Sequence, residues 1–284
     1  MGRYLAVNIE VIVNSLSEPL LERLRALLRA RLGLLISDSF SPRVMRELEE
    51  YVAAWPGGWQ NFLTTLDLGQ DMALIKKLAD IFTITHTYFF REPTHFDFLK
   101  EVALPELRSG EEKALRIWSA ATSSGEEAYS ILLTMAEYYG DHYWELDAGV
   151  LATDISKRAL TKAVEGVYST DGLRNVPVEL VRKWFSPEEE GRMIIDARLR
   201  QEATFRWLNL IEPMPIFRRP FHVIFCRNVL LYFDETTRSA VIEGLSRCLA
   251  PGGWLIMGHA EDSRPARNWL EPVSGSIYRK ARAD

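Results

Sequence analysis

Apolar residues in the first third of the chain recur at the spacing of helices. Ser41 followed by Pro42 predicts the start of a second helix, because serine caps a helix and proline is tolerated at its first position. The Pro-Gly-Gly run at residues 56–58 ends that helix, and further helices are expected over residues 59–68 and 71–82. The pattern predicts a small all-helical domain over residues 1–83. The apolar stripe of the first helix, with steps of three or four residues, is made by Leu20, Leu21, Leu24, Leu27, Leu28, Leu32 and Leu35.

Beyond about residue 114 short apolar runs alternate with helical patterns. Such alternation predicts parallel strands joined by right-handed helical crossovers, which is an α/β fold. Residues 187–200 break the rhythm, and we interpret them as part of a small β insertion at about residues 170–206. The expected second domain covers residues 84–284. Its strands are predicted over residues 115–120, 149–153, 204–208, 221–226 and 254–257, and its helices over residues 126–139, 156–165 and 236–249.

The composition is that of a soluble globular protein. Of the 284 residues, 47% are hydrophobic and 26% are charged, and the formal net charge is −5. A negative chain argues against a nucleic-acid partner, because phosphate contacts need a basic surface. Cys226, Cys248 and five scattered histidines show no metal-ligand spacing, so we expect no metal and a reducing cytoplasmic location.

No segment approaches the roughly 20 apolar residues that a membrane-spanning helix needs, so membrane insertion is not expected. The apolar amino end superficially suggests a signal peptide. Asn8 and Glu10 interrupt that run, however, and no small-residue cleavage site follows it.

The most informative stretch is FHVIFCRNVLLYFD, residues 221–234. A continuous apolar run fits a central strand that is covered on both faces. It is followed at once by Arg227 and Asn228, and then by Tyr232. Polar side chains at the carboxyl end of a buried parallel strand lie where open α/β sheets bind their ligands.

A second candidate follows the first predicted strand, in the sequence WSAATSSGEEAYS. A strand, a turn of small residues and a helix start form the usual cradle for a nucleotide-like ligand. Gly125 is the only glycine, so the three-glycine dinucleotide fingerprint is absent. Ser124 and Glu127 have the spacing of a helix capping box, and we assign capping to Glu127 and ligand contact to Glu126.

Asp154 ends the second predicted strand. An acidic residue there is placed to accept hydrogen bonds from two ribose hydroxyls. The alternative is that Asp154 only caps the helix that follows, which is a common use of aspartate.

The order of these motifs resembles one family closely. The motifs are TYFFRE (87–92), WSAATSSGEEAYS (118–130), ATDIS (152–156), NL (209–210), FCRNVLLYFD (225–234) and LAPGGWLIMGHAE (249–261). Together they are similar to the chemotaxis receptor glutamate O-methyltransferase (CheR) family, over roughly the last two hundred residues. The resemblance implies a Rossmann-like sheet that uses S-adenosylmethionine to methylate glutamates of chemoreceptors, with S-adenosylhomocysteine as product.

The resemblance also implies the site residues. Arg91 and Tyr232 would lie nearest the transferred methyl group and act in catalysis. Glu126 and Asp154 would suit the amino group and ribose hydroxyls, and Asn209 with Leu210 the adenine. The implied cofactor-binding residues are Thr85, Thr87, Arg91, Glu126, Asp154, Asn209, Leu210, Arg227 and Asn228.

Some positions depart from the family pattern. Thr85 replaces the usual asparagine, Thr122 and Ser124 replace residues of the first turn, and Ala128 replaces a proline. None of these departures removes a charge. Ala260 replaces the usual serine of the GHSE motif.

The implied reaction needs alignment more than acid–base chemistry. A glutamate side chain has an ordinary pKa near 4.3, so at neutral pH it is already the nucleophile. Arg91 can hold that carboxylate with its planar guanidinium. The ring of Tyr232 can border a positively charged sulfur, or its hydroxyl can orient the carboxylate.

Two features bear on the receptor. Arg23, Arg25, Arg29 and Arg31 cluster on the first long helix, where they form either a solvated face or a surface for the acidic helices of a receptor. In the β insertion the turn SPEEE is short and acidic. We therefore expect that the protein does not use the receptor's C-terminal pentapeptide as a tether.

Two alternatives remain open. The same fold could methylate another acceptor, although the Arg-Asn-Val-Leu sequence at residues 227–230 differs from the Asn-Pro-Pro-Tyr type motif of amino-nucleobase methyltransferases. The chain could also be a sensor that binds S-adenosylmethionine without transferring methyl groups. Retention of both Arg91 and Tyr232 argues against a sensor.

Overall fold

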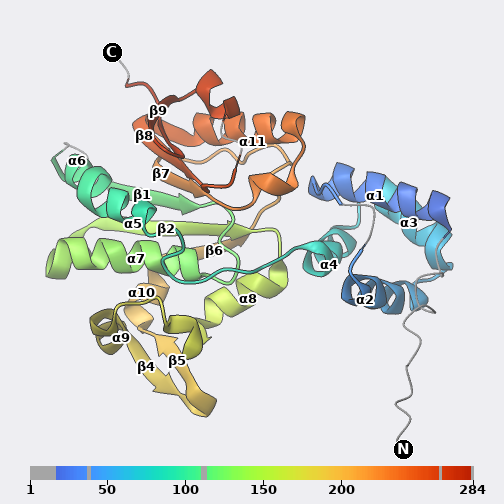
Figure 1. Cartoon of the computed structure of the whole chain (residues 1–284), viewed down its shortest axis with the longest axis horizontal. Helices are drawn as coiled ribbons and strands as arrows, with labels where there is room; N and C mark the ends of the chain where they lie inside the picture. The colour runs from blue at the N-terminus through green and yellow to red at the C-terminus, as the bar shows by residue number, and fades with distance from the viewer. Residues whose placement is uncertain (1–16, 37–39, 110–113, 262–263, 283–284) are drawn as a thin grey trace, which may run out of the picture. The chain divides into compact units, whose positions relative to one another are not determined.

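The computed structural model describes residues 17–36, 40–109, 114–261 and 264–282. The chain divides into two compact units, Met1–Phe82 and Thr83–Asp284 (Figure 1). No helix of the described residues is long and apolar enough to cross a membrane.

The first unit is helical, as the leucine spacing predicts. Ser41 accepts a hydrogen bond from the backbone N–H of Val44 at 3.3 Å, so it caps the second helix as expected. Arg31 donates to the carbonyls of Leu66 and Asp67, which joins the end of the first helix to the end of the third. The helices are α1 (Glu18–Leu32), α2 (Pro42–Ala53), α3 (Gly58–Leu68) and α4 (Met72–Phe82).

The second unit is built around a seven-stranded sheet with the order β6-β2-β1-β7-β8-β10-β9. The first five of these strands pair in parallel, while β10 pairs antiparallel with both β8 and β9. The strands are β1 (Ala114–Ser119), β2 (Asp147–Asp154), β6 (Ala203–Trp207), β7 (Phe221–Cys226), β8 (Leu249–Met257), β9 (Glu271–Ser274) and β10 (Ile277–Arg279).

Helices cover both faces of this sheet (Figure 1). The helix α7 begins and ends where the sequence predicts. The helices are α5 (Thr94–Phe98), the π-helical segment η2 (Leu99–Ala103), α6 (Leu104–Ser109), α7 (Glu126–Tyr139), α8 (Lys157–Glu165), α9 (Val178–Trp184), α10 (Ala197–Gln201) and α11 (Glu235–Cys248), with short 3-10 turns η3 (Gly140–Glu145), η4 (Asp171–Leu173), η5 (Glu189–Gly191), η6 (Leu230–Tyr232) and η7 (Arg264–Asn268).

The central strand β7 is buried along its whole length, and its side chains alternate between two apolar cores. Val223 and Phe225 join the core beneath α5 and α7, whereas Ile224 and Cys226 join the core beneath α11. Successive side chains of a strand point to opposite faces, so an entirely apolar strand must be covered twice. The continuous apolar run of the sequence therefore reflects a two-sided sheet, and the predicted α/β class is confirmed.

The antiparallel end of the sheet was missed by the sequence patterns. Both β9 and β10 are shorter than five residues, and β9 is exposed throughout. A short, exposed edge strand gives no apolar run or period by which it could be recognised.

A separate three-stranded sheet has the order β3-β5-β4, with β3 (Val167–Ser169), β4 (Phe185–Glu188) and β5 (Arg192–Ile195). It packs on the same core as α7, because Tyr168 and Phe185 both lie against the buried ring of Phe89. The Tyr168 hydroxyl donates a 2.9 Å hydrogen bond to the carbonyl of Ser124. The small sheet therefore supports the turn that follows β1.

We expect Tyr168→Phe to lower the free energy of unfolding by about 1 kcal/mol, because the change removes one buried hydrogen bond and keeps the ring. The Ser124 carbonyl then loses its hydroxyl donor. The measurement is urea unfolding followed by tryptophan fluorescence. An unchanged unfolding midpoint would contradict a supporting role for this bond.

Candidate active site

The strand order places the candidate site at the carboxyl ends of β1 and β7. The chain runs from β1 outward through β2 to β6, and then returns to the other side of β1 as β7. Two neighbouring connections leave such a switch point in opposite directions, which opens a crevice where α/β sheets bind ligands. Glu126 follows β1, and Arg227, Asn228 and Tyr232 follow β7, while the other predicted residues lie at the ends of β2 and β6 or on the segment before α5.

The turn after β1 is fixed by hydrogen bonds of Ser123 and by the backbone conformation of Gly125. Ser123 has a φ of 53°, and its N–H donates to Asp154 Oδ2 at 2.7 Å. Its hydroxyl donates to the carbonyl of Thr85 at 2.9 Å. Gly125 has a φ of 97°, and a Cβ there would lie 2.8 Å from the side chain of Ala163, so a larger residue would be strained and crowded. Thr85, Asp154 and the turn after β1 are therefore neighbours.

Asp154 does not act as the cap of α8. The cap is Ser156, whose hydroxyl accepts from the N–H of Ala159 at 3.1 Å. The Asp154 carboxylate instead accepts from the N–H groups of Ser123 and Ser156, at 2.7 and 2.8 Å. These two bonds fix the orientation of the carboxylate at the end of β2.

Glu126 begins α7 and receives a 2.7 Å hydrogen bond from the Ser124 hydroxyl. Burial raises the pKa of its carboxyl, and the bond from Ser124 opposes this only in part. Among the described residues no lysine or arginine forms an ion pair with it. A buried carboxylate without a paired cation is costly, and a bound ammonium group would relieve the cost.

Glu127 does not cap α7, contrary to the prediction, and the cap position is Gly125 without a side-chain bond. Its carboxylate accepts from the Ser119 hydroxyl at 2.7 Å and from Arg227 Nη1 at 3.0 Å. The physical reason is the buried guanidinium at the end of β7, which needs a counter-charge. Burial raises the pKa of Glu127, while Arg227 and Ser119 oppose this.

Arg227 is the centre of the buried polar network. Its side chain is 1% exposed. Besides Glu127, it donates through Nη2 to Glu92 Oε2 at 3.1 Å and to the backbone carbonyl of Arg91. Asn228 donates to the other Glu92 oxygen at 3.2 Å. Burial tends to raise the pKa of Glu92, but the bonds from Asn228 and Arg227 lower it overall.

These bonds hold an unusual turn that carries Arg91. Its neighbours Phe90 and Glu92 both have left-handed backbone conformations, with φ of 54° and 56°. Such conformations cost free energy for residues with a Cβ and persist where the surroundings impose them. The Arg91 guanidinium donates to the carbonyl of His86 at 3.2 Å and lies 5.8 Å from the ring of Tyr88. The backbone of Arg91 is therefore held from inside while its side chain is half-buried.

Glu261 is a further site residue to which the sequence analysis assigned no role. Its carboxylate accepts from the N–H groups of Val229, Leu230 and Gly258, at 2.8, 2.7 and 2.6 Å. It thereby ties the loop after β8 to the segment that follows Asn228, which has a φ of 58°. Its position at the end of the GHAE sequence is the signal that could have identified it.

The adenine-side residues follow β6. Asn209 is 3% exposed and Leu210 is 7% exposed. The N–H of Leu208 donates to the Asp154 carbonyl at 3.1 Å, which brings this loop beside the end of β2. The two predicted adenine contacts therefore start next to the predicted ribose contact.

Tyr232 and Thr87 have fewer contacts with the other predicted site residues. Tyr232 ends the 3-10 turn η6 and packs in part against the core beneath α11. Thr87 is half-buried on the segment that leads to Arg91. Within the described residues, no hydrogen bond or cation–π contact joins Arg91 to Tyr232. Hydrogen bonds thus connect Arg91 to Arg227 directly, Arg227 to Asn228 through Glu92, and Thr85 to Asp154 through Ser123.

The unmet polar groups of the site fit S-adenosylmethionine. Glu126 suits an ammonium group, and Asp154 places a carboxylate at the end of β2, where hydroxyls can donate to it. Thr122 Oγ1 and Arg227 Nε are buried and have no hydrogen-bond partner among the described residues. These groups at the switch point of a sheet of this order are the ones expected of an S-adenosylmethionine-dependent methyltransferase.

Comparisons with known proteins identify the family. Residues 85–279 match the family described as CheR methyltransferase, SAM binding domain. The chemotaxis protein methyltransferase of Borreliella burgdorferi is 33% identical over 276 residues, which cover 96% of this chain and 92% of that protein. The chemotaxis protein methyltransferase of Escherichia coli is 32% identical over 254 residues, covering 87% and 86%. The chain therefore belongs to the CheR methyltransferase family.

Solved structures are more distant. The N-methyltransferase NodS from Bradyrhizobium japonicum, in complex with S-adenosyl-L-homocysteine, is 15% identical with a TM-score of 0.38, covering 66% of this chain and 85% of that one. At this similarity it adds nothing to the assignment made from the sequence relatives.

Glu126→Gln should raise the melting temperature of the ligand-free protein at neutral pH. It should also weaken S-adenosylmethionine binding about tenfold or more, since a charged hydrogen bond to the ligand contributes about 1.5–3 kcal/mol. A carboxyl with a raised pKa favours folding below its ordinary value of 4.5, and this contribution is lost as the pH rises through the folded-state value. The stability difference between variant and wild type should therefore grow from acid to neutral pH.

Thermal scans across that pH range and calorimetric titration with S-adenosylmethionine test both effects. Glu179→Gln, an exposed glutamate on α9, is the control and should change neither. Unaltered affinity in Glu126→Gln would remove Glu126 from the cofactor site.

Proposed function

We propose that this protein transfers the methyl group of S-adenosylmethionine to glutamate side chains of chemoreceptors, giving glutamate methyl esters and S-adenosylhomocysteine. The observation that carries the proposal is the family match over residues 85–279, which includes every candidate site residue. The relatives quoted above, matched over most of their length, are named chemotaxis protein methyltransferases. The function is sensory adaptation in chemotaxis, with the cytoplasmic domain of a chemoreceptor as partner.

The proposed cofactor residues are Thr85, Thr87, Arg91, Glu126, Asp154, Asn209, Leu210, Arg227 and Asn228. Support is strongest for Glu126 and Asp154, because Glu126 is a buried carboxylate at the start of α7 and Asp154 ends β2 beside the turn after β1. Arg227 is different, since its Nη atoms are engaged by Glu127, Glu92 and the Arg91 carbonyl. Its main contribution is to position the Arg91 turn, with only Nε left for a ligand.

The proposed catalytic residues are Arg91 and Tyr232. The acceptor glutamate is ionised at neutral pH, so the protein needs no general base. S-adenosylmethionine, when bound, supplies a methyl group on a positively charged sulfur. Arg91 orients the acceptor carboxylate with N–H groups that its contact to the His86 carbonyl leaves available. The ring or hydroxyl of Tyr232 borders the reacting groups.

Removal of water assists such a transfer. A carboxylate and a positively charged sulfur give two neutral products, so the charge decreases along the reaction. Tyr232 is half-buried against Leu230 and Phe233, which are themselves buried, and this apolar surround limits the access of water.

The proposed domain division assigns methyl transfer to residues 84–284, with an insertion at about 170–206, and keeps residues 1–83 as a helical domain. Within the helical unit, Arg23 lies 3.6 Å from Asp67 and Arg25 lies 3.0 Å from Glu18. Together with the bonds of Arg31 to α3, these contacts within the helical unit favour a solvated helix face over a receptor surface.

The β insertion supports a tether-independent mode of receptor binding. The connection between β4 and β5 is the three-residue turn Glu189–Gly191, preceded by Glu188. These acidic side chains are exposed. A pentapeptide that ends in a carboxylate would meet like charge there, so we propose that the tail is not used.

The alternatives are less favoured. A sensor without catalysis and a methyltransferase for another acceptor would both need a different family assignment or the loss of a site residue. The chain matches the CheR family and retains both Arg91 and Tyr232, so neither condition is met.

Incubation of the purified protein with labelled S-adenosylmethionine and membranes from its own cell should place base-labile label on a receptor band, because glutamate methyl esters hydrolyse in base. Receptors shortened by their C-terminal pentapeptide should be labelled at the same rate. Base-stable label would exclude a glutamate ester, and loss of label with the shortened receptor would establish a tether.

Arg91→Ala should reduce methyl transfer about 100-fold while it weakens cofactor binding less than tenfold, because an unaligned acceptor loses the benefit of orientation. Transfer is followed with labelled cofactor, and binding by calorimetric titration. Arg182→Ala, an exposed arginine on α9, is the matched control and should leave both unchanged. Equal losses in both measurements would assign Arg91 to the cofactor alone.

A further inference from the structure

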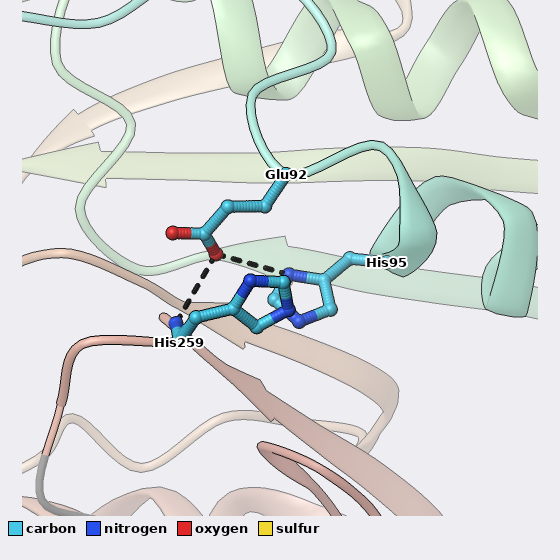
Figure 2. A group of neighbouring side chains, drawn as sticks. All are labelled: Glu92, His95 and His259. Atoms are coloured by element: carbon cyan, nitrogen blue, oxygen red, sulfur yellow. Dashed lines mark hydrogen bonds and ion pairs between the residues drawn. The ribbon is translucent and has the colours of Figure 1, made fainter.

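Two neighbouring side chains, Glu92 and His95, meet the distant His259 beside the Arg91 turn. Glu92, His95 and His259 each offer a ligand atom, and these atoms lie within 4.8 Å of one another (Figure 2). It is the one such group found among the described residues. We infer that this group is a binding site for a divalent transition-metal cation of the Zn²⁺ type. This inference does not depend on the proposed receptor substrate.

His95 has an unmet nitrogen. The residue is 1% exposed, and its Nε2 lies 3.0 Å from the Ser276 hydroxyl. Its Nδ1 is buried without a hydrogen-bond partner among the described residues, and it faces Glu92 Oε2 at 3.4 Å. A metal-binding histidine commonly uses its second ring nitrogen in a hydrogen bond that fixes the ring, as Nε2 does here. The Nδ1 lone pair is then directed towards the Glu92 carboxylate. A cation between them would be bound by both Nδ1 and the carboxylate oxygen.

The separation of the two atoms suits a shared metal. Zn²⁺ binds histidine nitrogen at about 2.0–2.1 Å and carboxylate oxygen at about 2.0–2.2 Å in a tetrahedral arrangement, so two such ligands stand about 3.4 Å apart. The distance from His95 Nδ1 to Glu92 Oε2 is 3.4 Å. Two ligand atoms are therefore already spaced as one edge of the coordination tetrahedron.

His259 supplies the third ligand. It follows β8, and its ring centroid lies 4.5 Å from that of His95, with an angle of 67° between the rings. The residue is exposed, and outside the cluster its ring contacts the Thr94 hydroxyl, with Nε2 3.5 Å from Oγ1. The ring can therefore rotate towards the cation. Its backbone N–H donates to Glu92 Oε2 at 3.3 Å, which keeps the two residues together. Two histidines and one carboxylate leave a fourth position for water.

The local charge permits a cation. The Glu92 carboxylate accepts hydrogen bonds from the positively charged Arg227 and from the Asn228 amide, which are partners of an ionised carboxylate. The guanidinium of Arg227 is the competing positive charge, and it is shared with Glu127. Oε1 of Glu92 keeps its bond to Asn228. A metal at Oε2 competes with the bonds from Arg227 Nη2 and from the backbone N–H of His259, and leaves the other bonds of the network in place.

The test uses the full chain after treatment with a chelator and its removal by dialysis. Zn²⁺ is titrated in competition with a chromophoric chelator, and Co²⁺ is titrated while the visible absorption of a tetrahedral site is recorded. The wild type should bind one equivalent of each. His259→Ala should weaken Zn²⁺ binding about tenfold or more and abolish the Co²⁺ band, because it removes one ligand from an exposed position.

His142→Ala is the matched control. His142 Nδ1 also lies 3.4 Å from a carboxylate three residues away, that of Glu145, but both side chains are largely exposed and lack a third ligand. This variant should bind Zn²⁺ as the wild type does. Absence of stoichiometric binding in the wild type, or equal affinity in His259→Ala and the wild type, would overturn the inference.

Discussion

The site depends on one buried charge, the guanidinium of Arg227. A cation removed from water is costly unless it is paired and hydrogen-bonded. Arg227 meets Glu127 on α7, Glu92 on the segment before α5, and the carbonyl of Arg91. Three segments that are distant in the sequence are thereby joined at the end of β7. The left-handed turn around Arg91 follows from this pairing, because the bonds to Arg227 and Asn228 offset its backbone strain.

The acidic residues at this edge of the sheet have separate tasks, which their surroundings assign. Glu127 balances Arg227, and Glu261 binds the backbone of the segment after β7. Burial raises the pKa of Glu126, which has no arginine or lysine ion pair among the described residues, and this favours contact with a cationic ligand. The same type of side chain is structural where a buried cation or several backbone N–H groups bind it, and is suited to a cationic ligand where no lysine or arginine is paired with it.

The metal inference follows from the same network. Glu92 Oε2 lies 3.1 Å from Arg227 Nη2 and 3.4 Å from His95 Nδ1. Figure 2 shows the same carboxylate beside both histidines. A cation bound to His95 and His259 would therefore share a carboxylate with the residue that positions Arg91. Such sharing couples occupancy of the metal position to the turn that carries the proposed acceptor-binding side chain.

The sequence by itself determined the two-sided sheet, most helix boundaries and the strand ends that carry polar residues, because apolar period and caps are local signals. It also identified the family through motifs in order. Only the tertiary structure decided how the polar groups are paired. Glu127 has the spacing of a cap, yet a guanidinium 100 residues away takes its carboxylate. His95 and His259 are scattered in the sequence, yet the fold brings their rings together. The reason is physical: partner choice for a buried polar group depends on which donors and acceptors share its desolvated volume, and sequence spacing does not contain that information.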